Sequence, residues 1–295
     1  DTVRDQAVEK GIQNGVMTAY AIHELNAAII KAEAGNWGPD DAQHAWDEGW
    51  AFYHGPDDSG ADFDGCGPYA TADKRAGNFG TDNADGTAAA NVATLAAMNA
   101  GLTAMQNEDM QGLLDARDEV LKNIVIVYSQ ASVRYASKMT EDLAAGDADD
   151  YDKHQAEGHA FFRVIEAYVA DHTDACYNNQ THGMAYIGAS AAATCDAFTW
   201  TQYQGQGDYM CYNTVVHMVY AEATTEEICN GFASMFPGSG MPGYYADYGA
   251  SQIVNIFDLS DDGDTTADYE ADIRSYLQPA WNAFGITAED IGTLQ

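Results

Sequence analysis

Hydrophobic positions recur every three or four residues over most of the first 170 positions of this 295-residue chain, which is the period of amphipathic helices. In residues 5–34 this spacing defines one apolar face, which we expect to pack against the core. The face consists of Val8, Ile12, Val16, Tyr20, His23, Ala27 and Ile30. The helix should end at Gly35 and a second should run from Pro39 to Gly55, which predicts a helical hairpin.

The rest of the chain divides into further helices and irregular stretches. Between them, residues 57–86 are rich in Asp, Gly and Thr, which predicts a long ordered loop with one short helix. After residue 170 the period weakens, and no alternating pattern typical of a sheet is found. The expected helices cover residues 87–106, 112–145, 149–170, 182–203, 208–222, 225–236, 266–284 and 287–293.

A short motif occurs twice and suggests an internal repeat. The segment Glu-Gly-x-Ala-Phe-aromatic stands at 48–53 and again at 157–162, each time after an Ala-Gly pair that closes a long helix. We therefore expect a mainly α fold, a pseudo-symmetric helical bundle built from two repeated hairpins over residues 1–170. Residues 171–295 should form a loop-rich, disulfide-stapled part that packs on the bundle as one unit.

Charge excludes several classes of function. The chain has 46 acidic and 12 basic side chains, a formal net charge of −34. Such a surface cannot neutralise phosphates, so nucleic-acid binding is excluded, and it is repelled by anionic lipid. No run of about 18 apolar residues occurs, so no membrane span is expected. A surface this poor in lysine suits a saline or cation-rich exterior.

Cysteine usage indicates an oxidising compartment. No Cys-x-x-Cys pair occurs, which argues against a zinc ribbon or a thioredoxin-type site. Cys176, Cys195, Cys211 and Cys229 lie close together and should form disulfides, with Cys66 left over or paired at long range. The chain starts at Asp1 without a leader, and Asn179 opens a glycosylation sequon. We therefore expect a mature, secreted glycoprotein.

The two acids of the repeated motif are the main site candidates. We expect both carboxylates at a buried seam, where a carboxylate must be protonated, paired or bound to a metal. Histidines flank them, and inward Glu and His on facing helices are common metal ligands in bundles. The predicted metal ligands are His23, Glu24, His44, Glu48, His54, Glu157 and His159.

A packing interpretation explains the same acids without a metal. Arg134 could neutralise Glu157, and His23 could hydrogen-bond Glu48, which would fix the helices and bind nothing. The sequence leaves both interpretations open. A weaker calcium-loop pattern stands at Asp258, Ser260, Asp262 and Asp264, where Tyr269 replaces the required Glu. We find no catalytic motif, so the sequence predicts a protein that is not an enzyme.

Segments 45–53, 67–75 and 78–81 resemble the low-iron-inducible periplasmic proteins of algae, which are iron-assimilation proteins also described as high-CO2-inducible extracellular proteins. The segment 157–162 fits their duplicated helical pattern. The resemblance implies a secreted, non-enzymatic protein that assists iron uptake by binding iron or by presenting it to a cell-surface transporter. Glu48 and Glu157 are the metal-capable positions within the motif.

Two functional hypotheses follow. In the first, iron binds between the hairpins, with Glu48 and Glu157 as carboxylate ligands and His23 as nitrogen donor. In the second, the chain is an acidic coat or filament subunit, whose copies are cross-linked by calcium.

Overall fold

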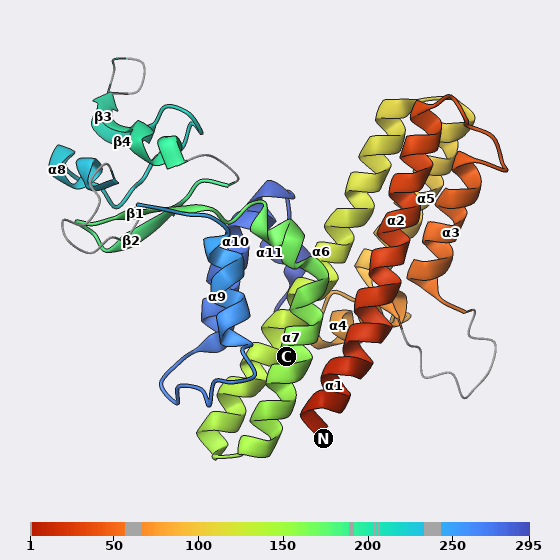
Figure 1. The fold of residues 1–295 in the computed structure, drawn as a ribbon, viewed down its shortest axis with the longest axis horizontal. Coiled ribbons are helices and arrows are strands. Elements are labelled where there is room, and N and C mark those ends of the chain that lie inside the picture. The colour runs from red at the N-terminus through yellow and green to blue at the C-terminus, as the bar shows by residue number, and fades with distance from the viewer. Residues whose placement is uncertain (1, 57–66, 189–191, 203–204, 206, 233–242) are drawn as a thin grey trace. The chain divides into compact units, whose positions relative to one another are not determined.

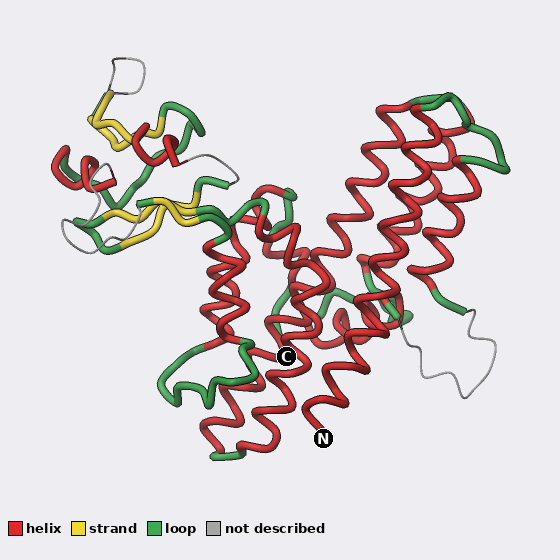
Figure 2. Tube along the Cα trace, viewed as in Figure 1, coloured by secondary structure: helices red, strands yellow, loops and turns green. Residues whose placement is uncertain are grey.

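The computed structural model describes residues 2–56, 67–188, 192–202, 205, 207–232 and 243–295, and it is mainly helical (Figures 1 and 2). The chain divides into two compact units. We call the first the helical unit; it comprises Asp1–Ile165, Ile256–Arg274 and Phe284–Gln295. The second, the disulfide unit, comprises Glu166–Asn255 and Ser275–Ala283.

Long helices make up most of the helical unit, as the period of the sequence predicted. They are α1 (Thr2–Lys10), α2 (Met17–Glu33), α3 (Ala42–His54), α4 (Pro68–Phe79), α5 (Ala89–Gln106), α6 (Met110–Ala145) and α7 (Ala148–Ala170). A π-helix, η1 (Gly11–Val16), joins α1 to α2. The last helices of the chain are α10 (Tyr269–Ala283), of which Ser275–Ala283 belongs to the disulfide unit, and α11 (Ala288–Ile291).

Local chemistry explains where these helices start and stop. Gly35 and Gly146 have φ values of 83° and 72°, the left-handed region that suits glycine at a helix C-terminus. Pro68 occupies the first turn of α4, where its missing N–H costs nothing. Thr287 and Asp290 form a reciprocal capping box at the start of α11.

The core of the helical unit is built around the buried middle of α6. Tyr128 is fully buried there, and its hydroxyl lies 3.0 Å from the Thr18 hydroxyl of α2. The same hydroxyl donates to the side chain of Asn14 in η1 at 3.1 Å. Helices α2, α4 and α5 all pack on α6.

The prediction of which face the first helix buries was wrong. Val8, Ile12, Val16, Tyr20 and Ile30 are among the exposed large hydrophobic residues. The buried face of α2 is instead Thr18, Ala21, Ile22, Leu25, Ala28, Ile29 and Ala32. Both faces carry apolar residues at helical spacing, so the period alone cannot choose between them. The face rich in alanine is the one that packs, because small side chains let helices approach closely.

The two hairpins carry the same motif but use it differently. A Cβ on Gly49 would come within 2.9 Å of Leu25 Cδ2, so this glycine lets α3 approach α2. A Cβ on Gly158 would overlap the ring of Phe257, which belongs to a later part of the chain. The matched glycines thus meet unrelated partners, and the pseudo-symmetric repeat of the hairpins is not confirmed.

The disulfide unit contains short strands, which contradicts the expectation that this chain has none. Strand β1 (Ala175–Asn178) pairs antiparallel with β2 (Gly183–Tyr186) and with β5 (Tyr244–Tyr245). Strand β3 (Phe198–Gln202) pairs antiparallel with β4 (Tyr209–Asn213). The helices predicted over 182–203 and 208–222 are therefore wrong. Strands this short show too few positions for an alternating pattern to stand out.

The remaining elements of this unit are single turns and one longer helix. They are η2 (Ala192–Ala197), α8 (Glu226–Cys229), η4 (Asn230–Phe232) and α9 (Tyr248–Ile256), the last of which ends at the unit boundary.

Two disulfides staple the unit, which confirms the expectation drawn from cysteine spacing. Cys176 bonds to Cys195, and Cys211 bonds to Cys229. Cys66 lies outside the described residues, as does the acidic run Asp57, Asp58, Asp62 and Asp64.

The disulfide unit contains a duplication that we did not predict. Residues 176–198 and 211–232 each contain Cys-Tyr-Asn, then a His, a Tyr and a Cys-x-x-Phe. Asn178 donates to the carbonyl of Ile228, next to Cys229, at 2.7 Å. Asn213 donates to the carbonyl of Thr194, next to Cys195, at 2.6 Å. Each copy therefore binds the other reciprocally.

The two copies also share equivalent contacts elsewhere. The Tyr177 hydroxyl lies 3.0 Å from His182 Nδ1, and the equivalent distance from Tyr212 to His217 is 2.9 Å. Both histidines have a left-handed backbone conformation, with φ angles of 56° and 57°. Phe198 and Phe232 stack on each other with ring centroids 4.0 Å apart. We call residues 176–198 and 211–232 the paired modules.

Candidate functional site

Most of the predicted metal ligands lie on the surface as separate pairs. His44 Nε2 lies 3.4 Å from Glu48 Oε1, and the two side chains are 59% and 46% exposed. His23 Nε2 lies 4.0 Å from Glu24 Oε1, and the His23 side chain is 70% exposed. The expectation that Glu48 and His23 face a buried seam was therefore wrong, because the helix face that carries them is not the packed one.

The other predicted histidines have local roles. His54 Nδ1 lies 3.1 Å from the carbonyl of Gly55, and its ring packs against both Trp50 and Tyr69, which also contact each other. His159 lies near Asp258, whose pKa is lowered mainly by hydrogen bonds from Ser260 and slightly by this imidazole. Among the described residues, no three His, Cys, Asp or Glu side chains form a group that could hold a metal ion.

Glu157 is the predicted ligand that is buried as expected, with 6% of its surface exposed. Burial raises the pKa of this carboxyl above its ordinary value. The charges of His154, Lys153 and Lys10 and hydrogen bonding to Tyr135 offset part of this shift. Glu157 is thus a desolvated carboxylate surrounded by partners that favour its ionised form.

The two residue pairs of the packing interpretation, Arg134 with Glu157 and His23 with Glu48, are not formed in the described structure. In the described part of the chain, Arg134 forms no ion pair with Glu157, and its Nε is buried without a hydrogen-bond partner. The imidazole partner of Glu48 is His44 and not His23. Neither predicted pair therefore neutralises the motif acids.

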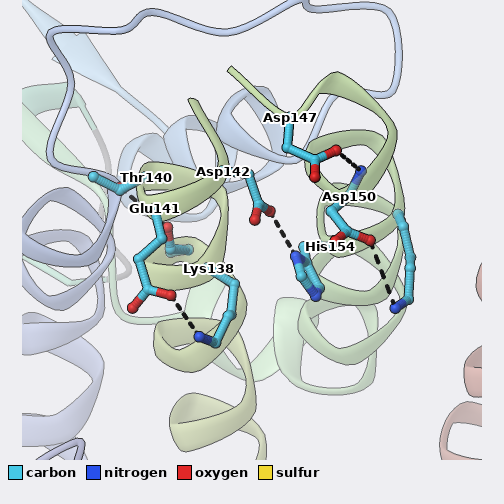
Figure 3. Close-up of polar contacts among 9 residues, drawn as sticks. Lys138, Thr140, Glu141, Asp142, Asp147, Asp150 and His154 are labelled. Atoms are coloured by element: carbon cyan, nitrogen blue, oxygen red, sulfur yellow. Dashed lines mark hydrogen bonds and ion pairs between the residues drawn. The ribbon is translucent and has the colours of Figure 1, made fainter. Parts of the chain in front are cut away.

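A carboxylate–imidazole pair that sequence reasoning missed joins the two helices of the second hairpin. Asp142 Oδ2 of α6 lies 2.6 Å from His154 Nδ1 of α7, and the side chains are only 13% and 15% exposed. Figure 3 shows the Asp142 carboxylate directed at the His154 ring from the facing helix. The turn at Gly146 indicates a helical hairpin, but it does not specify which side chains of the two helices meet.

Glu157 belongs to the same side of the hairpin as this pair. It follows His154 by three positions, so the two residues share a face of α7. Tyr135 lies about two helical turns before Asp142 on α6, so these two residues share a face of that helix. The ring centroid of Tyr135 is 6.0 Å from that of His154. Two carboxylates, an imidazole and a phenol thus line one hairpin, and these are hard or borderline donors of the kind that iron takes.

The candidate calcium loop uses its carboxylates to form its own turns. Asp258 accepts from the N–H and hydroxyl of Ser260, and Asp264 accepts from the N–H and hydroxyl of Thr266. These bonds lower the pKa of both carboxyls. Calcium binding by Asp258, Ser260, Asp262 and Asp264 remains a prediction, as does glycosylation of Asn179.

Comparison with known proteins locates the chain by family. Across the described residues, no helix combines the length and the apolarity needed to cross a bilayer. No curated protein matches the chain, and no solved structure matches it. The sequence model of the low iron-inducible periplasmic protein family matches residues 2–185, a range that includes both hairpins. The chain therefore belongs to the family of low iron-inducible periplasmic proteins.

Proposed function

We propose that this periplasmic protein binds iron for assimilation, and that Asp142, His154 and Glu157 of the second hairpin, which form no three-ligand group in the described structure, close around the ion when it binds. The observation that carries the proposal is the contact of 2.6 Å between Asp142 and His154, with the buried Glu157 one helical turn away. Iron is the cargo in this proposal, and the protein is a binding protein rather than an enzyme. Delivery to a cell-surface transporter would be the next step.

The donor chemistry suits this cargo. Carboxylate oxygens and an imidazole nitrogen bind iron well, and residues on two packed helices hold their positions better than residues on loops. The Asp142–His154 hydrogen bond brings one carboxylate and one imidazole together before any ion arrives. Because ligands must be deprotonated, iron should compete with protons and bind more weakly at acidic pH.

The sequence-based ligand set makes a rival prediction within the same function. That set joins Glu48 to Glu157 through His23, together with Glu24, His44, His54 and His159. The two proposals share Glu157 and differ in the hairpin that supplies the histidine. The first hairpin offers a pair of the same chemistry, His44 and Glu48, which is much more exposed.

Variants of the two hairpins separate these proposals. Purified protein would be loaded with ferric citrate, dialysed against metal-free buffer and measured for iron by elemental mass spectrometry. We expect D142N/H154Q to lose most of the retained iron and H44Q/E48Q to keep it. Loss of iron only in H44Q/E48Q would favour the sequence-based set. No retained iron in the wild-type chain would contradict both.

A further inference from the structure

A small pocket of the helical unit contains an unusual amount of positive charge for this protein. Three of the chain's 12 basic residues, Lys10, Lys74 and Arg75, line it. The cavity holds about 90 Å³, which is enough for a compact ion and too little for a drug-sized molecule. In a chain with a net charge of −34, positive charge gathered in this way needs an explanation.

Arg75 supplies the strongest evidence that something is bound there. The residue is only 9% exposed, and its Nε and Nη1 are buried with no hydrogen-bond partner. Burial lowers the pKa of its guanidinium, and the nearby charge of Arg134 adds to that effect. Buried donors without acceptors are rare in folded proteins, and a bound water or ion is one explanation of such a donor where it lines a pocket.

Several other polar groups of the pocket already have hydrogen-bond partners. The Thr71 hydroxyl donates to Asn14 Oδ1 at 2.6 Å, and Asn14 Nδ2 donates to the carbonyl of Lys10 at 3.2 Å. Lys10 Nζ lies 2.8 Å from Glu9 Oε1 at the exposed edge. Among the described pocket residues, Arg75 is therefore the one with buried donors left over.

Two groups that face Arg75 fix its position, and one of them, Tyr135, also hydrogen-bonds its side chain, but Nε and Nη1 remain without an acceptor. Its Cζ lies 5.7 Å from the ring centroid of Tyr135, a cation–π distance. The Tyr135 ring in turn stacks on Phe161, with centroids 5.3 Å apart. Glu157 attracts the guanidinium electrostatically and raises its pKa, but the two form no ion pair.

We propose that this pocket is a binding site for a compact oxyanion, whose oxygens accept hydrogen bonds from Arg75 and are attracted by Lys10 and Lys74. A buried guanidinium whose Nε and Nη1 lack acceptors can donate charged hydrogen bonds to the oxygens of a phosphate or a carboxylate. The η1 π-helix, which brings Asn14 to the pocket, is an element found frequently at functional sites. The proposal does not rest on the proposed iron site, although Tyr135 and Glu157 lie near both sites.

Calorimetric titration with inorganic phosphate tests the proposal. The buffer would contain no other oxyanion, and about 0.15 M NaCl would screen the repulsion from the acidic surface. We expect one site in the wild-type chain and about tenfold or greater weakening in R75Q, the loss typical of a charged hydrogen bond. Acetate, titrated separately, distinguishes a carboxylate preference from a phosphate preference.

Two further variants keep the test decisive. R117Q removes an equal charge from α6, where Arg117 is bonded to Asp118 and Asn26, and should bind phosphate like the wild type. K74Q changes the pocket without removing the buried guanidinium, and it should weaken binding even if R75Q fails to fold. The proposal would be overturned if neither anion binds, or if R117Q weakens binding as much as K74Q and R75Q do.

Discussion

Two pairs of segments in this chain share a sequence motif, the two helical hairpins and the paired modules. Only the paired modules also make equivalent contacts. The hairpins share Glu-Gly-x-Ala-Phe, yet Gly49 packs on Leu25 while Gly158 packs on Phe257. In the paired modules, Asn178 and Asn213 each bind the carbonyl beside the other module's cysteine. A motif therefore marks structural duplication only when its residues meet equivalent partners.

The acids of the hairpin motif illustrate the consequence for function. Glu48 is half exposed beside His44 of its own helix, whereas Glu157 is buried and is influenced by residues of three helices, α1, α6 and α7. The same sequence motif thus places its glutamate in a solvated surface pair in one hairpin and in a desolvated environment in the other. This difference is why we place the proposed iron site in the second hairpin.

Removal of either disulfide should have the largest effect and should affect the paired modules equally. The bonds close 19 and 18 residues, so chain entropy predicts a loss of about 3 kcal/mol for each. We expect C176S/C195S and C211S/C229S to lower the thermal midpoint of the disulfide unit to a similar extent. Near-UV circular dichroism measures this, and a clear loss in one variant alone would break the equivalence of the modules.

The glycines of the hairpin motif should respond unequally to alanine. G158A forces a methyl group into the buried ring of Phe257 and should cost about 1–3 kcal/mol, as overpacked cores do. G49A crowds Leu25 at 2.9 Å and the carbonyl oxygen of Ala21 at 3.2 Å, which is a looser fit than the overlap with the Phe257 ring, and it should cost less. Urea unfolding of both variants gives the comparison.

The matched control for these variants is Gly77 of α4, which has no atom within 4 Å of an added Cβ. G77A should stabilise the protein by about 0.5–1 kcal/mol, the helix-propensity gain of alanine. If G158A and G49A had equal costs, the two hairpins would be more alike than their contacts indicate.

The pH dependence of stability should differ slightly between the two motif acids. Burial raises the pKa of Glu157, so the folded chain holds this proton to higher pH than the unfolded chain. Stability is therefore lost as pH rises through the raised pKa, and metal-free E157Q should be more stable than the wild type at neutral pH. The difference in stability between E157Q and the wild type should disappear as pH falls below 4.5, the ordinary pKa of a glutamate side chain.

E48Q serves as the control for this effect, because its side chain is half exposed. Denaturant midpoints between pH 4 and pH 8 would measure both variants. If the stability advantage of E157Q over the wild type instead grew as the pH was lowered, folding would favour the charged form of Glu157.

The sequence predicted the long helices well because their signals are local. Period, glycine stops and the cap at Thr287 each act within a few residues, and α6 begins and ends close to where they place it. The packed face of α2 could not be predicted, because both of its faces carry apolar residues and the choice depends on the partner helices.

The site was predicted in part for the same reason. Glu157 could be identified from its place in a motif, and its burial agrees with the expectation. The Asp142–His154 pair and the unsatisfied Arg75 depend on contacts between helices, which no spacing within one helix reveals. The strands were missed because each is at most five residues long.

The most direct test of the iron proposal is anomalous diffraction at the iron absorption edge from crystals of the iron-loaded protein. We predict an anomalous peak within bonding distance of Asp142 and His154, with Glu157 beside it. A peak at His44 and Glu48, or no ordered peak in crystals that contain iron by elemental analysis, would contradict the account.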